Sequence, residues 1–328
     1  MKLKVASLFS GCGGMDLGIQ GGFEFLERKY AKHPIELVFA SDIDSYAVDI
    51  YNDNFKHKAV LGDIRELKNE IPKHDILIGG FPCQSFSIVA QNPPRLGYKN
   101  DTGKLFFEMV DVLKKHSPRA FIAENVKGLL SANKKQAFPL IMDAFKDAGY
   151  FCKYVLQNSV DLGVPQKRER VFIVGFKSEK DLLAFDFPES ISESHKSVLN
   201  DVLTPESEIP SKYFFSDKAV QGMLRAKETM NKGRAQNPML ACNTISAHLS
   251  KASLNSVDPV MCLEGRYRRF TPLEASRIQS FPDTFNFNVS DTRAFKAIGN
   301  AVPPVMMWHI SQEVMKALST IKHQNRVA

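Results

Sequence analysis

The sequence has few cysteines, and their positions match neither a disulfide framework nor a zinc site. The 328 residues include five cysteines, an odd number, and no two of them form a CxxC pair. Small disulfide-stapled domains and cysteine-based metal sites are therefore not expected, and the pattern favours a reducing compartment. The sequence also lacks an uncharged apolar run long enough to span a bilayer, and we identify no N-terminal leader with a cleavage site. These absences predict a cytoplasmic protein that holds no metal.

Internal repeats and low-complexity tracts are also absent, so a repeat architecture is not predicted. The composition is that of a globular protein, with 44% hydrophobic and 24% charged residues. A chain of this length can bury a large core and can form two domains. The formal net charge is +7. A basic balance favours a polyanionic partner, because Lys and Arg neutralise phosphates.

Short apolar runs alternate with amphipathic helical patterns along the first half of the chain. The expected strands are residues 5–9, 37–40, 59–61, 76–78, 120–123 and 171–176, and the expected helices are residues 15–20, 44–55, 105–115 and 136–148. This alternation predicts an α/β fold with a doubly wound, mostly parallel sheet. Ligands bind beyond the carboxyl ends of the strands in such sheets. We therefore expect the functional site at that edge.

The alternation ends near residue 177, and the following segment is irregular and rich in Ser, Pro and Asn. Order returns at Thr271-Pro272-Leu273-Glu274, a capping box with proline at the first helical position, so a helix is expected there. A closing helix is expected over residues 305–318. We predict one domain from residues 1–185 and 299–328, and a second, smaller domain with a hinge from residues 186–298.

A glycine-rich loop follows the first expected strand. It reads Phe9-Ser10-Gly11-Cys12-Gly13-Gly14 and leads into a helix, so its backbone amides can approach a ligand closely. Asp42 and Asp63 end the next two strands, where carboxylates can accept hydrogen bonds from ribose hydroxyls and from an adenine amino group. The GxGxxG spacing of dinucleotide-binding folds is not met. The three features at successive strand ends predict an adenosine-containing cofactor.

Two further strand ends carry reactive side chains. Cys83 follows Pro82 at a strand end, before a long polar loop that runs to Gly103. A lone cysteine is usually an inert hydrophobe, but at this position it would be exposed beside the cofactor and could act as a nucleophile. Glu124 ends the neighbouring strand, where burial would favour its protonated form and suit it to general acid catalysis.

A charged cluster, Gln166-Lys167-Arg168-Glu169-Arg170, precedes the last strand expected in the sheet. Such a run is most often a solvated turn. Arginines placed over a pocket could instead grip a phosphate or a base carbonyl.

Taken in order, these motifs resemble those of the cytosine-C5 DNA methyltransferase family, of the kind found in bacterial restriction–modification systems. The resemblance covers nearly the whole chain. It includes the Pro-Cys nucleophile motif at 82–83, the Glu-Asn-Val motif at 124–126 and the Gln-x-Arg-x-Arg motif at 166–170. The segment from Arg269 to Arg277 and the Gly299-Asn300-Ala301-Val302 loop resemble the last two motifs. The eight motifs in family order make the resemblance specific.

The resemblance implies a DNA (cytosine-5-)-methyltransferase with a Rossmann-like methyltransferase fold and S-adenosyl-L-methionine as the methyl donor. Cys83 would add to C6 of a flipped-out cytosine, Glu124 would donate to N3, and Arg168 would hold the base carbonyl. The loop of residues 85–103 would close over the base. The residues implied at the cofactor are Phe9, Ser10, Gly11, Cys12, Gly13, Gly14, Asp42, Ile43, Asp63, Ile64, Pro82, Leu105, Asn300, Ala301 and Val302.

The resemblance also implies double-stranded DNA as the partner and target recognition by the smaller domain, in loops that enter the major groove. The implied DNA contacts are Gln84, Ser85, Ser87, Arg170, Thr244, Ile245 and Arg269. The family mostly acts as monomers in the bacterial cytoplasm, and a restriction endonuclease that shares the target site would be the counterpart. Two positions depart from the family: Thr102 stands where Arg is frequent, and Ile43 stands where some relatives have an aromatic residue.

Other functions share part of this pattern. An amino-methyltransferase needs an Asp/Asn-Pro-Pro-aromatic motif at a strand end, whereas Asn92-Pro93-Pro94-Arg95 ends in arginine and lies within a loop. A nicotinamide dehydrogenase would share only the glycine loop and Asp42, and a non-catalytic DNA-binding module would not need Cys83 or Glu124. An RNA cytosine-C5 methyltransferase of the same fold stays open, because the sequence does not specify the nucleic acid.

Overall fold

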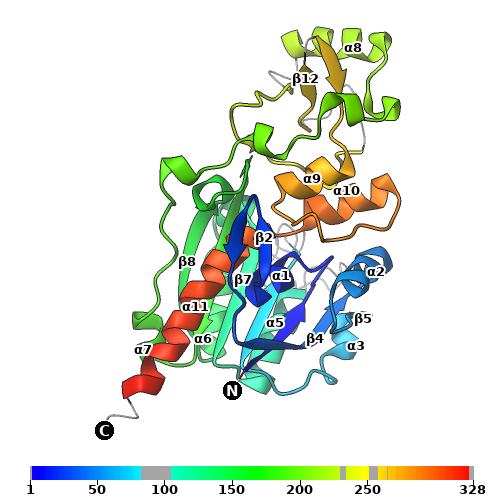
Figure 1. Ribbon diagram of the computed structural model, residues 1–328. Helices are drawn as coiled ribbons and strands as arrows, with labels where there is room; N and C mark the ends of the chain where they lie inside the picture. The colour runs from blue at the N-terminus through cyan, green and yellow to red at the C-terminus, as the bar shows by residue number, and fades with distance from the viewer. Residues whose placement is uncertain (1, 83–104, 230–233, 251–257, 264, 325–328) are drawn as a thin grey trace.

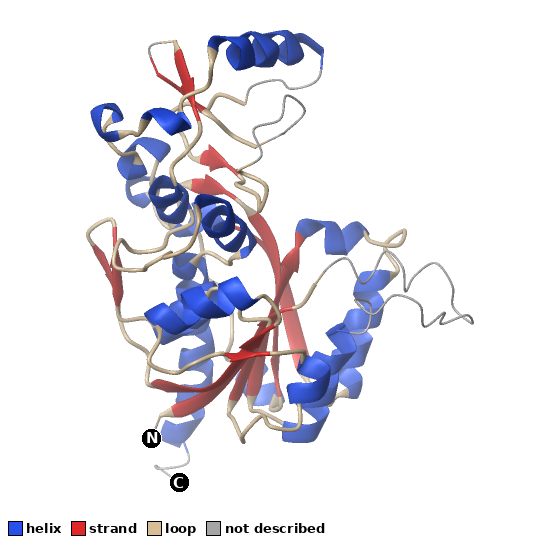
Figure 2. Cartoon of the chain, turned by 90° about the vertical axis from the view of Figure 1, so that its right-hand side faces the viewer, coloured by secondary structure: helices blue, strands red, loops and turns tan. Residues whose placement is uncertain are grey.

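The centre of the protein is a seven-stranded sheet with the order β5-β4-β1-β6-β7-β10-β8 (Figure 1). The computed structural model describes residues 2–82, 105–229, 234–250, 258–263 and 265–324. Figure 2 shows the sheet as a twisted layer with helices on both of its faces. The predicted α/β class and the mostly parallel sheet are therefore confirmed.

The parallel part of the sheet has five strands: β1 (Leu3–Leu8), β4 (Ile35–Asp42), β5 (Val60–Leu61), β6 (Ile76–Gly80) and β7 (Ala120–Val126). From β1 the chain moves outward to β4 and β5, and then returns to place β6 and β7 on the other side of β1. The strand order thus reverses between β1 and β6. Such a switch point opens a crevice at the carboxyl ends of the two strands, which is where ligands bind in this class of sheet.

The far side of the sheet is antiparallel. Strand β10 (Glu169–Phe176) lies between β7 and β8 (Phe151–Asn158) and runs antiparallel to both. The sequence predicted β10 but not β8, because most of the side chains of this edge strand are exposed or only half-buried. The direction of β10 matters for the site: its first residues, rather than its last, lie at the carboxyl edge of the parallel strands.

Alternating residues of the strands contribute to two hydrophobic clusters, one on each face of the sheet. On one face, Val5 packs with residues of α1 (Gly14–Gln20), α2 (Ser45–Asn54) and α11 (Pro304–Gln324). On the other face, Ala6 packs with residues of α3 (Ile64–Leu67), α5 (Leu105–His116) and α6 (Ala137–Asp147). Helix α7 (Glu179–Leu183) lies with the first group.

The chain between the sheet and the last helix contains α8 (Asp217–Thr229), the hairpin of β12 (Met261–Leu263) and β13 (Arg266–Arg268), α9 (Pro272–Ile278) and α10 (Asp291–Asn300). Helix α8 and β12 lie farthest from the sheet, and α9 and α10 lie between them and it (Figure 1). Buried residues of α9 and α10 belong to the same cluster as the sheet residues. These two helices therefore pack on the larger part of the protein, while α8 and the hairpin project from it.

The predicted capping box at α9 is confirmed. Thr271 Oγ1 accepts from the Glu274 amide at 3.1 Å, and the Glu274 carboxylate accepts from the Thr271 amide at 2.9 Å. The same carboxylate forms two hydrogen bonds with Arg268, each at 2.8 Å, and both side chains are buried. This group fixes the start of α9 and joins it to β13.

Two short strand pairs complete the described structure. Strands β2 (Phe23–Phe25) and β3 (Arg28–Tyr30) form a hairpin after α1. Strand β9 (Gln166–Lys167) pairs in parallel with β11 (Cys242–Asn243), which joins the start of the Gln-x-Arg-x-Arg motif to a segment of the smaller part. None of the helices in the described ranges combines the length and apolar character that a bilayer crossing requires.

Candidate active site

A cavity of about 740 Å³ lies at the carboxyl ends of β1, β4, β6 and β7, where the strand order reverses. Fourteen of the fifteen residues predicted at the cofactor line it, and Gly13 is the exception. These fourteen are Phe9, Ser10, Gly11, Cys12, Gly14, Asp42, Ile43, Asp63, Ile64, Pro82, Leu105, Asn300, Ala301 and Val302. The structure thus brings residues from six segments of the sequence into one cavity.

The glycine loop is shaped by close packing as well as by backbone freedom. Gly13 has a φ of 94°, and a Cβ at this position would lie 2.4 Å from the Phe55 ring. At Gly14 a Cβ would lie 2.3 Å from the carbonyl oxygen of Val302. Gly13 therefore allows the end of α2 to pack against the glycine loop. Gly14 allows the loop of residues 299–302 to lie directly on it.

Asp42 is the best-positioned acceptor in the cavity. One carboxylate oxygen accepts from the Gly11 amide at 2.8 Å, and the other accepts from the Asp44 amide at 2.9 Å. Burial raises the pKa of Asp42, and the two amides act against that shift. Each oxygen keeps a further lone pair, so the carboxylate can accept ribose hydroxyls while the backbone holds it in place.

At the next strand end, Asp63 also caps a helix. The Asp63 carboxylate accepts from the Arg65 amide at 2.9 Å and pairs with the Arg65 guanidinium, which lowers the pKa of Asp63. This carboxylate therefore caps α3, in addition to lining the cavity. Ile64 is buried, whereas the Ile43 side chain is 70% exposed and offers an uncovered apolar surface. Exposed apolar surface of this kind can pack against the face of an adenine ring.

Helix α10 covers one side of the cavity through contacts that the sequence analysis missed. Lys296 Nζ lies 2.6 Å from the Asp44 carboxylate, and the Arg293 guanidinium lies 3.2 Å from the centroid of the Tyr46 ring. All four residues line the cavity. In the sequence, these contacts are indicated only by the two cations Arg293 and Lys296, which lie three residues apart in the helix that ends at Asn300.

A buried carboxyl group lies beneath the glycine loop. Asp16 is fully buried and accepts from Ser7 Oγ at 2.9 Å and from Tyr51 Oη at 3.0 Å. Burial raises the pKa of Asp16 to about 7, and these two hydrogen bonds reduce that shift. The group thus joins β1, α1 and α2 under the cofactor loop, in a role that the sequence analysis did not identify.

This raised pKa predicts a loss of stability as the pH rises. The unfolded carboxyl ionises near pH 4, whereas the folded one keeps its proton up to about pH 7. In that window the unfolded state binds fewer protons, so the free energy of unfolding falls by about 1.4 kcal/mol per pH unit. Asp16→Asn should reduce the difference in unfolding free energy between pH 5 and pH 8 by about 3 kcal/mol, measured by urea unfolding. An unchanged difference would contradict this assignment.

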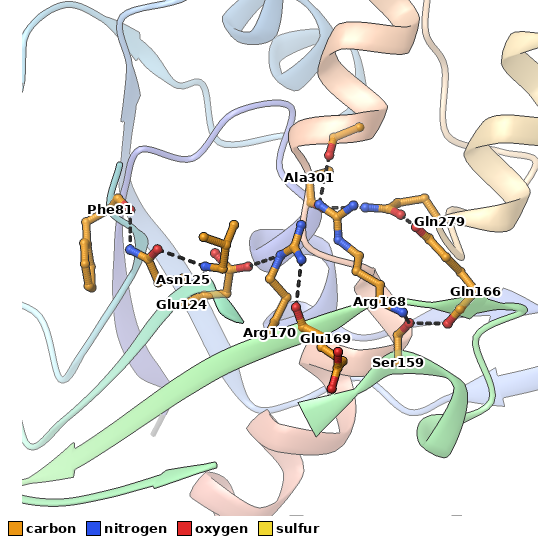
Figure 3. Close-up of polar contacts among 12 residues, drawn as sticks. Phe81, Glu124, Asn125, Ser159, Gln166, Arg168, Glu169, Arg170, Gln279 and Ala301 are labelled. Carbon is orange, nitrogen blue, oxygen red and sulfur yellow. Dashed lines mark hydrogen bonds and ion pairs between the residues drawn. The ribbon is translucent and has the colours of Figure 1, made fainter. Parts of the chain in front are cut away.

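The Glu124 side chain faces Arg170 at the edge of the cavity (Figure 3). Arg170 Nε lies 3.0 Å from Glu124 Oε1, and both side chains are largely buried. The antiparallel register places Phe172 opposite Glu124, so Arg170 is the diagonal neighbour of the glutamate on the same face. Burial raises the pKa of Glu124, and the nearby Arg170 and Arg168 act in the opposite direction. The site therefore holds an acid that burial biases toward its protonated form.

Asn125 connects this strand to the segment that leads to Cys83. Its Nδ2 atom donates to the Phe81 carbonyl at 2.8 Å, and its Oδ1 atom accepts from the Val126 amide at 2.9 Å. Pro82 follows Phe81 and lines the cavity. The predicted nucleophile Cys83 and the predicted DNA contacts Gln84, Ser85 and Ser87 lie outside the described residues, as do Thr102 and the rest of the predicted closing loop.

Five other predicted residues in the described ranges do not line the cavity. The Arg168 guanidinium donates to the backbone carbonyls of Ile245, Gly299 and Ala301, and Figure 3 shows the contact with Ala301. The Ile245 side chain is completely buried, so it presents no surface to a base. Arg269 donates to the carbonyls of Ser250 and Lys212. Thr244 is exposed, with its hydroxyl donating to the Lys167 carbonyl at 2.7 Å. Arg170, which was predicted to contact DNA, is the arginine that pairs with Glu124.

Within the described ranges, no group of His, Cys, Asp and Glu side chains has the arrangement of a metal site. The polar groups at the cavity are instead carboxylates, amides and arginines, which suit an organic ligand with hydroxyl and amino groups.

Comparison with known proteins agrees with this geometry. The family model for C-5 cytosine-specific DNA methylases matches residues 3–316. The Type II methyltransferase M1.ScrFI of Lactococcus lactis subsp. cremoris is 35% identical to the chain, over 98% of this chain and 80% of that protein. The Type II methyltransferase M.NlaX of Neisseria lactamica is 35% identical, over 97% of this chain and 98% of that protein.

Two solved structures share the fold. The Dnmt2 methyltransferase of S. pombe superposes with a TM-score of 0.73 at 17% identity, over 98% of this chain and 99% of that one. A putative DNA modification methyltransferase from an E. coli prophage superposes with a TM-score of 0.68 at 21% identity, over 98% of this chain and all of that one (100%). The family match spans almost the whole chain. The chain therefore belongs to the C-5 cytosine-specific DNA methylase family, whose methyl donor is S-adenosyl-L-methionine.

Proposed function

We propose that the protein methylates C5 of a cytosine in duplex DNA through a covalent bond between Cys83 and C6 of the base, as the modification enzyme of a Type II restriction–modification system. One observation carries this proposal: the cofactor cavity, the buried Glu124–Arg170 pair and the strand that leads to Pro82 and Cys83 converge at one edge of the sheet. The relatives named above, both called Type II methyltransferases, support the modification role.

The residues of the cavity fit S-adenosyl-L-methionine. Asp42 can accept ribose hydroxyls, because two backbone amides already orient its oxygens. Ile43 and Ile64 offer apolar surface to the adenine ring, and Asn300 lines the same cavity. The cofactor supplies the methyl group, while the residues of the chain bind it, orient it and exclude water from the reacting base.

Cys83 is assigned as the nucleophile partly by the properties of the other cysteines. Of the four cysteines in the described ranges, Cys12 alone lines the cavity. Burial raises the pKa of the Cys12 thiol to about 12, so this thiol stays protonated and unreactive at neutral pH. Cys83 follows Pro82 directly, and Asn125 holds the backbone just before it. Pro82, the residue directly before Cys83 in the sequence, lines the same cavity as Glu124.

Glu124 and Arg170 are assigned to the base. When the Cys83 thiolate adds to C6, the electron pair of the C5–C6 double bond shifts toward C4 and N3, and a proton that Glu124 transfers to N3 neutralises the charge that develops there. This makes C5 nucleophilic toward the methyl group. Loss of the C5 proton, cleavage of the Cys83–C6 bond and return of the N3 proton to Glu124 then restore the aromatic ring and the acid. Arg170, rather than Arg168, is placed to hold the base carbonyl, because it is the arginine bonded to Glu124.

The target cytosine must leave the duplex to reach this site, because C6 is covered by stacking within the helix. Residues 186–298 are assigned as the recognition domain, and the exposed Thr244 is its candidate DNA contact. We assign a monomer in the bacterial cytoplasm as the acting species. An endonuclease that shares the target site would be its counterpart.

The proposal predicts which nucleic acid accepts the methyl group. The purified protein, incubated with tritiated S-adenosyl-L-methionine, should label plasmid duplex DNA, and enzymatic digestion should recover the label as 5-methyldeoxycytidine. Total tRNA in a parallel reaction should remain unlabelled. Label recovered as N4-methylcytosine or N6-methyladenine would contradict the proposed chemistry, and label in tRNA alone would contradict the proposed substrate.

A further inference from the structure

Arg168 holds three backbone carbonyls that come from two distant parts of the chain (Figure 3). Its Nη2 atom donates to the carbonyls of Gly299 at 2.8 Å and Ala301 at 3.1 Å, and its Nη1 atom donates to the carbonyl of Ile245 at 3.1 Å. The side chain is buried, with 1% of its surface exposed. The buried cation therefore joins the loop that carries Asn300 to the segment that follows β11.

Two buried glutamines complete the same network. Gln166 Nε2 donates to Gln279 Oε1 at 2.5 Å, and Gln279 Nε2 donates to the Ala301 carbonyl. Gln166 Oε1 accepts from the Ile245 amide at 2.9 Å. The amide and the carbonyl of Ile245 are thus held by Gln166 and Arg168, and the Ala301 carbonyl is held by Arg168 and Gln279. Both segments are fixed by the same three side chains.

Backbone packing brings the two segments into direct contact as well. A Cβ at Gly299 would lie 2.3 Å from the carbonyl carbon of Ser246, so only glycine allows this approach. On the other side of the loop, the Val302 carbonyl lies against Gly14 of the cofactor loop. A shift of the segment around Ser246 would therefore displace the loop of residues 299–302, which lines the cofactor cavity.

We propose that Gln166, Arg168 and Gln279 form a positioning clamp that couples the recognition segment 244–246 to the cofactor loop 299–302. None of the three side chains lines the cofactor cavity. The clamp sets the position of Asn300 and Val302, which line the cavity, and of the exposed Thr244. Burying a cation among carbonyls is costly, which is consistent with a role in fixing one arrangement rather than in stability alone. The DNA side of this coupling rests on the proposed function.

The clamp is tested by Arg168→Lys, with binding of the product analogue S-adenosylhomocysteine measured by calorimetry. Lysine keeps the charge but cannot reach all three carbonyls with one ammonium group. The Kd for S-adenosylhomocysteine should rise about tenfold, because the loop then spends most of its time away from the binding position. Gln279→Met, which keeps the volume but loses the contact with Ala301, should raise this Kd in the same direction if Arg168→Lys does not fold.

Arg268→Lys is the matched control. Arg268 is as buried as Arg168 and is bonded to Glu274, but it lies outside the clamp and does not line the cavity. This variant should lose stability and yet bind S-adenosylhomocysteine within about twofold of the wild type. A Kd that changes equally in Arg168→Lys and Arg268→Lys would indicate a merely structural role and would overturn the proposal.

A second measurement tests the coupling. The Kd for S-adenosylhomocysteine is compared with and without a plasmid fragment that the wild-type enzyme methylates, and the ratio of the two values is the coupling factor. The clamp predicts a ratio different from one in the wild type and close to one in Arg168→Lys and Gln279→Met. The same ratio in the wild type and in both variants would overturn the coupling. Failure of the wild type to methylate any DNA would instead contradict the proposed function and leave the cofactor arm of the test valid.

Discussion

Replacement of Cys83 by serine is expected to lower the rate of methyl transfer by more than about 10⁴-fold, the scale of loss when a covalent nucleophile is removed. A serine hydroxyl does not ionise near neutral pH, so it cannot form the bond to C6 that activates C5. The measurement is transfer of tritiated methyl groups to plasmid DNA under single-turnover conditions.

Two controls make this result specific. Binding of S-adenosylhomocysteine to Cys83→Ser should stay within about twofold of the wild type, because the change replaces one sulfur atom by oxygen in a residue that is not among the predicted cofactor contacts. Cys152→Ser should keep full activity, since Cys152 lies in β8, outside the assigned recognition domain, and does not line the cavity. Substantial methyl transfer by Cys83→Ser would mean that the reaction does not need this thiol, as in an amino-methyltransferase.

Replacement of Glu124 by glutamine is expected to lower kcat by about 10²- to 10⁴-fold, the usual contribution of a positioned general acid. Glutamine has nearly the same shape and can still contact Arg170, but it cannot transfer a proton to N3. The wild-type kcat should fall as the pH rises through the pKa of Glu124, which burial raises above its ordinary value. That fall should be missing in the variant, because it has no carboxyl group to titrate.

Glu169→Gln is the matched control for this change. Glu169 lies in the same strand as Arg170 and forms an exposed ion pair with Lys127. Exposed pairs contribute about 1 kcal/mol or less, so this variant should keep near wild-type kcat and the same pH profile. If Glu124→Gln retained wild-type kcat, the carboxyl group would not be the proton donor.

The sequence predicted the parallel part of the fold and most of the cofactor cavity for a simple geometrical reason. The glycine loop, Asp42 and Pro82 all follow short apolar runs, and the carboxyl ends of parallel strands meet at one edge. A motif placed just after a strand was therefore enough to place its side chains in space. The helix start at Thr271 could be predicted equally well, because a capping box is a local pattern.

The different contacts of Arg168 and Arg170 could not be predicted in this way. Both arginines precede or begin an apolar run, and they reach the carboxyl edge only because β10 runs antiparallel to β7. The direction of a strand depends on distant pairing, which leaves no local sequence signal. Once the register is known, Arg170 lies beside Glu124. Arg168 precedes the first residue of the strand, and its side chain contacts the loop of residues 299–302.

Burial and long-range contacts explain the remaining differences. Ile245 was predicted at the DNA by position within a motif, but its side chain lies in the main hydrophobic cluster. The ion pair of Lys296 with Asp44 joins residues 252 positions apart, so neither residue shows its partner in the sequence. Strand β8 was missed because an exposed edge strand has no continuous apolar run. The predicted domain boundaries at residues 186 and 298 stay a prediction.

The most direct test of the covalent mechanism uses duplex DNA in which 5-fluorocytosine replaces cytosine. A fluorine at C5 cannot leave as a proton, so an enzyme that adds a thiolate to C6 and methylates C5 is trapped on the DNA. The account predicts a protein–DNA adduct that survives denaturing electrophoresis, requires S-adenosyl-L-methionine and is absent with Cys83→Ser. Efficient methylation of ordinary DNA with no adduct on the fluorinated duplex would contradict it.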